Sequence, residues 1–145
     1  ASKLNLVWAL PRKLKRERQA NTVWVLSPAL ESETSVPGVR TTVASNLAQG
    51  VRYSYLIPDD PVVIERATRL HEELNSPHIE FRLGSAALFA FAVETVIYDA
   101  GTTRRLSLMV APTRRPEFDI VLGAHTASQF EVAFKSGWAS APQLF

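Results

Sequence analysis

Polar residues stand directly after two apolar segments of the sequence, and they are the first candidates for chemistry. Ser27 follows one segment, and Asp59 and Asp60 follow the next. Paired carboxylates can bind a divalent cation, and a serine beside a base can act as a nucleophile. However, no Gly-x-Ser-x-Gly elbow surrounds Ser27, and the sequence has no glycine-rich phosphate loop. We therefore favour structural roles, a hydroxyl bonded to nearby backbone before Pro28 and a cap for a following helix.

The histidines and the absence of cysteine argue against a metal centre. His71 lacks the second histidine of a His-Glu-x-x-His zinc motif, while His78 and His125 stand alone. The lack of cysteine excludes disulfides, a thiolate nucleophile and thiolate metal ligands. We expect neither a metal nor a cofactor, and a cysteine-free chain fits a cytoplasmic location.

Two pairs of arginines, Arg104-Arg105 and Arg114-Arg115, bracket an apolar segment close to Asp99. Guanidinium groups bind carboxylates and phosphates through paired hydrogen bonds. If the two pairs cluster near Asp99, they form a site for an anionic ligand or for nucleic-acid phosphates. The alternative, which we favour, is that the arginines decorate an edge strand and discourage aggregation between sheets.

The first 20 residues are strongly basic. Six basic residues and one acidic residue give this segment a charge of +5, whereas ten basic and thirteen acidic residues give the remainder −3. Such an arm can contact nucleic acid or an acidic partner. A solvated helix face or a linker helix is the favoured alternative. The basic residues are Lys3, Arg12, Lys13, Lys15, Arg16 and Arg18.

Short apolar segments that alternate with helical periodicity must position these candidates. Residues 2–20 are expected as a helix or arm broken near Pro11, and residues 29–36 as a polar loop. Tyr53 and Tyr55 alternate along one strand and are expected in the core or an interface. Strands are expected where β-branched and aromatic residues concentrate, at 22–27, 51–57, 79–83, 93–98, 105–110 and 118–122.

Proline, glycine and small polar residues predict where the helices begin and end. A helix is expected over 37–49, because proline suits its first turn and Gly50 suits a left-handed cap. Asp60 is expected to cap a second helix over 61–74. A last helix follows the final strand, with Thr126 expected as its cap in a capping box.

The order of elements predicts an α/β fold with a mixed β-sheet. A parallel βαβα start is followed by an antiparallel hairpin, a closing strand and a terminal helix, with helices on both faces of the sheet. The 145 residues suit a single domain, which we place at 22–138, after a basic arm or linker helix at 1–21 and before a tail at 139–145. No apolar run approaches the roughly 20 residues that span a bilayer, so no membrane association is expected.

Four stretches of the sequence resemble one half of the phospholipase D-like superfamily. They are V-W-V-L-S-P at 23–28, N-L-A-Q-G-V-R-Y-S-Y-L-I-P-D at 46–59, V-E-T-V-I-Y-D at 93–99, and F-D-I-V-L-G with F-E-V-A-F-K-S-G-W at 118–138. The resemblance covers residues 22–138. It is greatest to the non-catalytic modules of this fold that serve as regulatory or sensor domains in prokaryotic proteins.

The resemblance also implies where a catalytic centre would lie. Catalytic members carry His-x-Lys-x(4)-Asp, in which the histidine attacks phosphorus and the lysine stabilises charge on the phosphoryl oxygens. Counting back from Asp99 places Ala92 at the histidine position and Glu94 at the lysine position. An alanine cannot attack phosphorus, and a glutamate repels phosphate. The resemblance therefore implies a domain that has lost phosphodiester chemistry.

Three functions follow from these observations. The first is a non-enzymatic regulatory or interaction module of a larger bacterial protein, which pairs with a second copy or binds a ligand or partner domain. The second is a nucleic-acid-binding module that uses the basic arm and the arginine pairs. The third is a phosphodiesterase-like enzyme with an unrecognised site at Asp59, Asp60 and Asp99. We favour the first, with a homodimer or a partner domain as the expected assembly.

Overall fold

Seven strands form one sheet in the order β1-β7-β6-β5-β2-β3-β4. A computed structural model describes residues 6–90, 93–110 and 118–145. The strands are β1 (Val7–Ala9), β2 (Thr22–Leu26), β3 (Arg52–Ile57), β4 (Ile79–Leu83), β5 (Thr95–Tyr98), β6 (Leu106–Val110) and β7 (Phe118–Val121). The helices are α1 (Leu10–Arg18), α2 (Glu31–Ser35), α3 (Pro37–Ala48), α4 (Pro61–Leu74) and α5 (Ala124–Ser140), with a short 3-10 helix η1 (Ala86–Phe89).

The sheet is mixed, as the sequence predicts. Strands β2, β3 and β4 are parallel, and β5 joins β2 in the antiparallel direction. Strands β5 and β6 form the expected hairpin, and β7 and β1 extend it with further antiparallel pairs. The parallel half is thus built from crossover helices and the antiparallel half from a meander, which confirms the predicted fold class.

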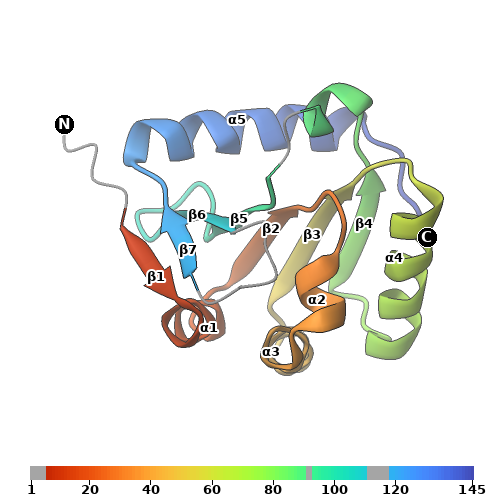
Figure 1. Ribbon diagram of the computed structural model, residues 1–145, viewed down its shortest axis with the longest axis horizontal. Coiled ribbons are helices and arrows are strands. Elements are labelled where there is room, and N and C mark those ends of the chain that lie inside the picture. The colour runs from red at the N-terminus through yellow and green to blue at the C-terminus, as the bar shows by residue number, and fades with distance from the viewer. Residues whose placement is uncertain (1–5, 91–92, 111–117) are drawn as a thin grey trace.

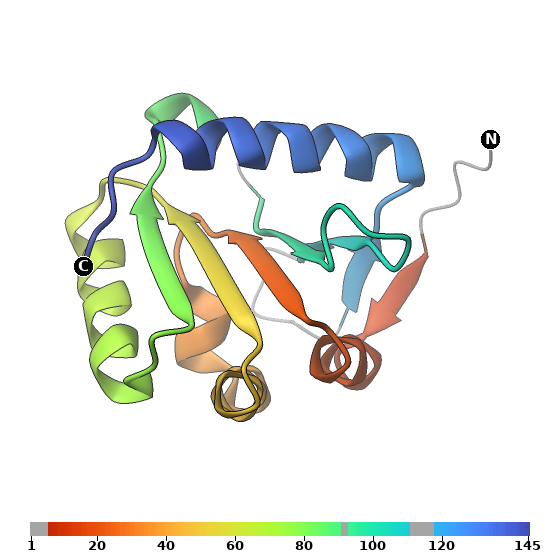
Figure 2. The ribbon, with the colours of Figure 1, turned by 180° about the vertical axis from the view of Figure 1, so that it is seen from behind.

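Helices cover both faces of the sheet. Helix α5 runs across one face, whereas α1, α2 and α3 lie on the other, with α4 beside β4 (Figure 1). The view from behind shows the same two layers (Figure 2). Each face has its own apolar core, a large one beneath α1, α3 and α4 and a smaller one beneath α5 around Leu56, Ile97 and Phe134.

The predicted helix boundaries of the parallel half are confirmed. Helix α3 begins at Pro37, and Gly50 follows it with φ 89°, a left-handed conformation that glycine adopts without steric cost. The carboxylate of Asp60 accepts hydrogen bonds from the amides of Val62 and Val63 and so caps α4. Tyr53 and Tyr55 are both buried, as expected.

The basic amino-terminal segment is integrated with the sheet, which differs from the expected arm. Strand β1 pairs with β7, and Pro11 stands in the first turn of α1 instead of breaking a helix. Leu10 and Leu14 pack against the larger core. Residues 7–18 therefore share the packing of the segment 22–138.

Two further local expectations are wrong. Residues 31–35, expected within a loop, form the short helix α2 after Leu30, which has φ 53°. Helix α5 begins at Ala124 after Gly123, so Thr126 lies inside the helix and is not its cap. The expected tail lies along β4, where the Leu83 amide donates to the Pro142 carbonyl. No helix in the described parts of the chain is long and apolar enough to cross a membrane.

Candidate functional site

The carboxyl end of β2 and the start of β5 bring Ser27 and Glu94 together. The antiparallel register pairs Leu26 with Thr95, so the residues just beyond that pair are neighbours. Ser27 Oγ donates to Glu94 Oε1 at 3.0 Å and accepts the Leu30 amide at 2.9 Å. Ser27 thus forms the expected backbone hydrogen bond, and it also holds a carboxylate that the resemblance places at a catalytic position.

Helix α2 supplies the other contacts to this carboxylate. Ser32 Oγ donates to Glu94 Oε2 at 3.2 Å, so both oxygens of Glu94 accept a hydroxyl. Burial raises the pKa of Glu94, although nearby Lys13 and the two serine hydroxyls act in the opposite direction. Glu94 is thus held by Ser27, which follows β2, and by Ser32 of α2.

Glu33 is a second buried carboxyl group beside Glu94. Its side chain accepts the Tyr55 hydroxyl at 3.0 Å, and its other oxygen, Oε1, has no hydrogen-bond partner in the described ranges. Burial and the charge of Glu94 raise the pKa of Glu33 to about 8. At neutral pH Glu33 therefore retains its proton, which relieves the repulsion between the two groups.

Lys13 of α1 is the buried cation among these acids. Burial alone would lower its pKa, but the charges of Glu17, Asp119, Glu94 and Glu33 outweigh this effect and the pKa of Lys13 is raised. Lys13 therefore stays charged, although only 4% of its surface is exposed. We call Lys13, Glu17, Glu33, Glu94 and Asp119 the Lys13 cluster.

Two tyrosines and an asparagine hold the inner end of the cluster. Tyr53 and Tyr98 donate their hydroxyls to the two carboxylate oxygens of Glu17 at 2.8 and 2.7 Å. Asn46 Nδ2 donates to the Glu17 carbonyl at 2.8 Å and lies 3.1 Å from the Tyr53 hydroxyl. Burial and the charge of Glu17 raise the pKa of both tyrosines, so they stay protonated as donors.

The Lys13 cluster disfavours an anion. The negative charges of Glu17, Glu94 and Asp119 act on the single ammonium group of Lys13, and Glu33 is protonated, so a phosphate would meet mainly negative charge. No group of three or more His, Asp or Glu residues in the described segments has the arrangement of a metal site. The arrangement can fix α1 and α2 on the sheet through the contacts of Glu17, Ser32 and Glu33.

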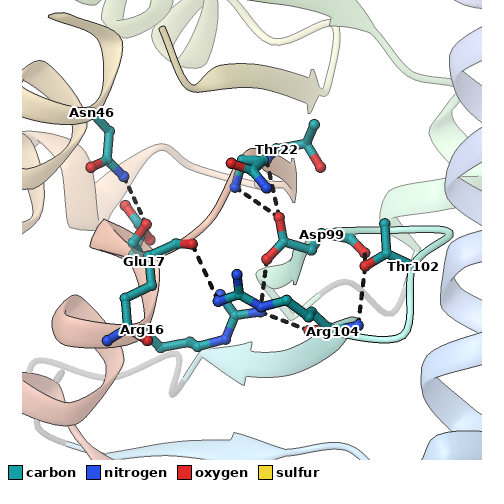
Figure 3. A network of polar contacts seen from close by, with 9 residues as sticks. Arg16, Glu17, Thr22, Asn46, Asp99, Thr102 and Arg104 are labelled. Atoms are coloured by element: carbon teal, nitrogen blue, oxygen red, sulfur yellow. Dashed lines mark hydrogen bonds and ion pairs between the residues drawn. The ribbon is translucent and has the colours of Figure 1, made fainter. Parts of the chain in front are cut away.

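Asp99 occupies the opposite end of β5 and binds backbone and Arg16 (Figure 3). Its carboxylate accepts from Arg16 Nη2 at 2.9 Å, the Asn21 amide at 2.7 Å and the Thr22 amide at 3.4 Å. Burial acts to raise the pKa of Asp99, but these donors outweigh it and the pKa is lowered. Asp99 therefore ties the hairpin to α1 and to the start of β2.

The arginines of the hairpin loop point to different partners. Arg105 Nη1 forms an ion pair with Glu131 of α5 at 3.0 Å. The carbonyl of Arg104 accepts from Arg16 Nη2 at 2.7 Å, and the Arg104 side chain reaches the Gln19 carbonyl at 3.5 Å. The structure therefore does not bring these two guanidinium groups together as an anion site. The other predicted residues Arg114, Arg115, Ala92 and Lys3 lie outside the described residues.

The basic residues of α1 divide between the interior and the surface. Lys13 is buried and Arg16 binds Asp99, as described above. The Arg12 guanidinium lies 4.7 Å from the centre of the Trp8 ring, a cation–π contact. Lys15 and Arg18 are exposed. These five residues do not form one continuous basic surface.

The three aspartates of the enzymatic alternative do not converge. Asp60 caps α4 beyond the carboxyl end of β3, and Asp59 precedes it. Asp99 lies beside Thr22, at the opposite end of the sheet. The separation follows from the antiparallel direction of β5, which a list of acidic residues cannot reveal.

His71 stacks on Phe145 with ring centres 4.3 Å apart.

Sequence reasoning missed the Lys13 cluster as a unit, although a signal was present. Lys13 and Glu17 share a helical stripe with Leu10 and Leu14, which is the stripe that α1 turns to the core. Charged residues at core positions require partners, and the alternating tyrosines of β3 offered them. Glu33 could not be found this way, because its segment was expected to be a loop.

Comparisons with known proteins give the fold its name. No family model matches the chain, and no curated protein matches it. Among solved structures it is similar to TrmBL2, an archaeal chromatin protein with a novel mode of DNA binding, with TM-score 0.62 and 12% identity over 96% of this chain and 53% of that one. The present chain thus spans about half of TrmBL2.

Two further solved structures match over nearly their whole length. Nuc from Salmonella typhimurium, a phospholipase D family member, has TM-score 0.63 and 13% identity over 97% of both chains. NucT from Helicobacter pylori has TM-score 0.60 and 10% identity over 97% of this chain and 98% of that chain. These likenesses, at low identity, support the expected architecture, and the chain has a phospholipase D-like fold.

Proposed function

We propose that this chain is a non-catalytic binding module, part of a larger bacterial protein, that associates with a second copy or a partner domain. The observation that carries the proposal is the state of Glu94. At the position where the resembled catalytic motif has a lysine, a carboxylate accepts hydroxyls from Ser27 and Ser32. A phosphodiester there would lack the cation that stabilises its transition state.

The surroundings of Glu94 support the same conclusion. Asp119 and Glu17 add further negative charge near Lys13, and Glu33 adds a carboxyl group that is protonated at neutral pH. Asp99, which the resemblance shares with catalytic members, is engaged by Arg16 and two backbone amides. Both ends of β5 therefore hold polar groups in structural contacts.

An exposed apolar strip at the β1–β7 edge supports self-association. Val7 is 58% exposed, Phe118 56% and Ile120 36%. The register pairs Val7 with Ile120 and Ala9 with Phe118, so these side chains lie next to one another. Asp119, which lies between Phe118 and Ile120, and Val121 are buried on one face of the sheet. Because side chains alternate along a strand, the strip lies on the other face of the sheet. An apolar strip of this kind suits a second copy of the chain.

Light scattering at two protein concentrations tests self-association. We expect the mass of wild type to reach that of a dimer, and Phe118→Asp to shift it to the monomer because a charge enters the strip. Val132→Asp is the matched control, since Val132 is 66% exposed on α5 and is not part of the strip. A strict monomer at both concentrations, or equal effects of the two substitutions, would contradict pairing through this edge.

Nucleic-acid binding is the second candidate, favoured by one observation. Lys15 and Arg18 are exposed on α1, and neither forms an ion pair with any residue in the described ranges. TrmBL2, described as a DNA-binding chromatin protein, has a similar fold. Under this alternative, affinity for duplex DNA falls steeply as salt rises, and Lys15→Gln with Arg18→Gln weakens it. Arg69→Gln, on exposed α4, is the control.

Substitutions suit this test better than a deletion of the basic segment would. Removing residues 1–20 would also remove Lys13 and Glu17, which are buried against the sheet. The deletion is therefore expected to disturb the fold, so it would not report on binding alone. Unchanged DNA affinity in the double substitution, at matched salt, would rule out α1 as the contact surface.

A further inference from the structure

Strand β5 separates two different interiors. Alternate side chains of a strand point to opposite faces of the sheet. Glu94 and Tyr98 point to the Lys13 cluster, whereas Val93, Thr95 and Ile97 point to the face beneath α5. On that second face the structure contains a partly open cavity of about 350 Å³.

The cavity is bounded by strands below and by two helical segments above. Strands β2, β3, β5 and β6 form its floor, and α5 and η1 form its walls. This volume lies within the range of small-molecule sites and far exceeds the voids of close-packed interiors. The lining residues are Leu26, Leu56, Ala87, Leu88, Val93, Thr95, Ile97, Met109, Phe130, Ala133 and Phe134.

The chemistry of the walls selects the ligand. Among the described residues that line the cavity, none carries a charge and Thr95 alone has a polar side chain. Thr95 donates its hydroxyl to the Val93 carbonyl at 3.2 Å, so this hydroxyl is already satisfied. An ionised group inside the cavity would lose its hydration without gaining a partner. Burial of hydrocarbon surface is the favourable contribution that these walls can make.

Close contacts hold the walls in place. Leu88 of η1 fits against Gly137 of α5, where an added Cβ would lie 2.7 Å from Leu88 Cδ1. On α5, Phe134 stacks on Trp24 with ring centres 4.9 Å apart, and Trp138 stacks on Phe134 at 5.8 Å. A preformed cavity binds without the cost of ordering its walls.

We propose that the cavity between α5, η1 and the sheet binds an uncharged, mainly hydrocarbon small molecule. The site is separate from the Lys13 cluster, from which β5 divides it, and from any phosphodiester chemistry. It depends neither on self-association nor on the basic residues of α1. It would give a non-catalytic domain a ligand that it can sense.

Fluorescence titration with the neutral probe N-phenylnaphthylamine tests the proposal. Wild type is expected to bind the probe saturably, with a rise in emission as the probe leaves water. Ala133 is an exposed lining residue at the opening of the cavity, so Ala133→Trp is expected to obstruct it and to weaken binding at least about tenfold. Val132→Trp places the same side chain one residue away on the exposed surface of α5, and is expected to bind within about twofold of wild type.

Competition and a second variant complete the experiment. Octanol is expected to displace the probe far better than octanoate, because the carboxylate cannot enter the cavity. Should Ala133→Trp fail to fold, as judged by circular dichroism, Ala87→Leu obstructs the opening of the cavity from η1. Equal binding by wild type and the obstructed variants, no saturable binding, or equal displacement by octanoate would overturn the proposal. So would probe binding that disappears as the chain self-associates, since a second copy would then occupy the cavity.

Discussion

Glu33 shows how the energetics of a single side chain can depend on one proton. The residue is buried beside Glu94, and its pKa is raised to about 8 from an ordinary value of 4.5. Between these values the folded chain retains a proton that the unfolded chain has lost. The free energy of unfolding therefore falls as pH rises from about 4.5 to about 8.

Glu33→Gln is expected to weaken this pH dependence. The amide keeps an acceptor for the Tyr55 hydroxyl but cannot ionise. At about pH 9 the variant is expected to be more stable than wild type by on the order of 2 kcal/mol, with little difference near pH 5. Urea unfolding at both values measures this, with Glu72→Gln on the exposed surface of α4 as the control. Identical pH profiles for wild type and Glu33→Gln would contradict a buried, protonated Glu33.

Asp99 has the opposite linkage to pH. Its pKa is lowered from an ordinary value of 3.8, so its contribution to stability is present above that value and is lost as pH falls through the lowered pKa. Asp99→Asn is expected to destabilise the fold at neutral pH by about 1 to 3 kcal/mol, because Arg16 loses a charged partner. Urea unfolding tests this. Glu65→Gln, which breaks the exposed pair with Arg69, should cost less.

At the scale of elements, local backbone signals predicted the helices best. Asp60 before Pro61 and Gly50 after α3 mark boundaries that the structure confirms, because capping and left-handed backbone depend on immediate neighbours. Residues 31–35 formed a helix against expectation because Ser32 and Glu33 contact β5 and β3, which are distant in sequence. Tertiary contacts of this kind leave no local signal.

The two expected caps provide an element-scale prediction. Asp60→Ala is expected to cost about 1 kcal/mol of stability, because it removes the acceptor for the first amides of α4. Thr126→Ala is the matched comparison, since Thr126 lies exposed within α5 and caps nothing. Thermal unfolding of the two variants should separate them. A larger loss for Thr126→Ala would show that α5 begins later than Ala124.

The amino-terminal segment shows why composition misled at the same scale. Six basic residues within 20 suggested a solvated arm, but charge counts do not reveal which face of a helix is buried. Lys13 and Glu17 lie on the buried face because Glu17 finds two tyrosine hydroxyls and Lys13 finds acidic neighbours. The fold class was predictable from the order of the elements. The contacts of Lys13 and Glu17 were not, because predicting them requires the register of four strands.

At the scale of the whole molecule, one sheet separates two kinds of interior. The face beneath α1, α2 and α3 buries the Lys13 cluster, and the face beneath α5 contains an apolar cavity. The phospholipase D-like fold, which is similar to the folds of TrmBL2, Nuc and NucT, accommodates both interiors. Fold alone does not determine activity. Any activity of this chain therefore depends on the side chains at the two ends of β5.

Hydrolysis of a phosphodiester is the measurement that tests the central claim most directly. Wild type at high concentration is incubated with bis(para-nitrophenyl) phosphate and with single-stranded DNA, beside Asp99→Ala and Glu94→Gln purified in the same way. We predict no hydrolysis above buffer for any of the three proteins, because the Glu94 carboxylate stands where the resemblance assigns the lysine of the catalytic motif. Turnover that rises in proportion to wild-type concentration and is lost in Asp99→Ala would contradict the account.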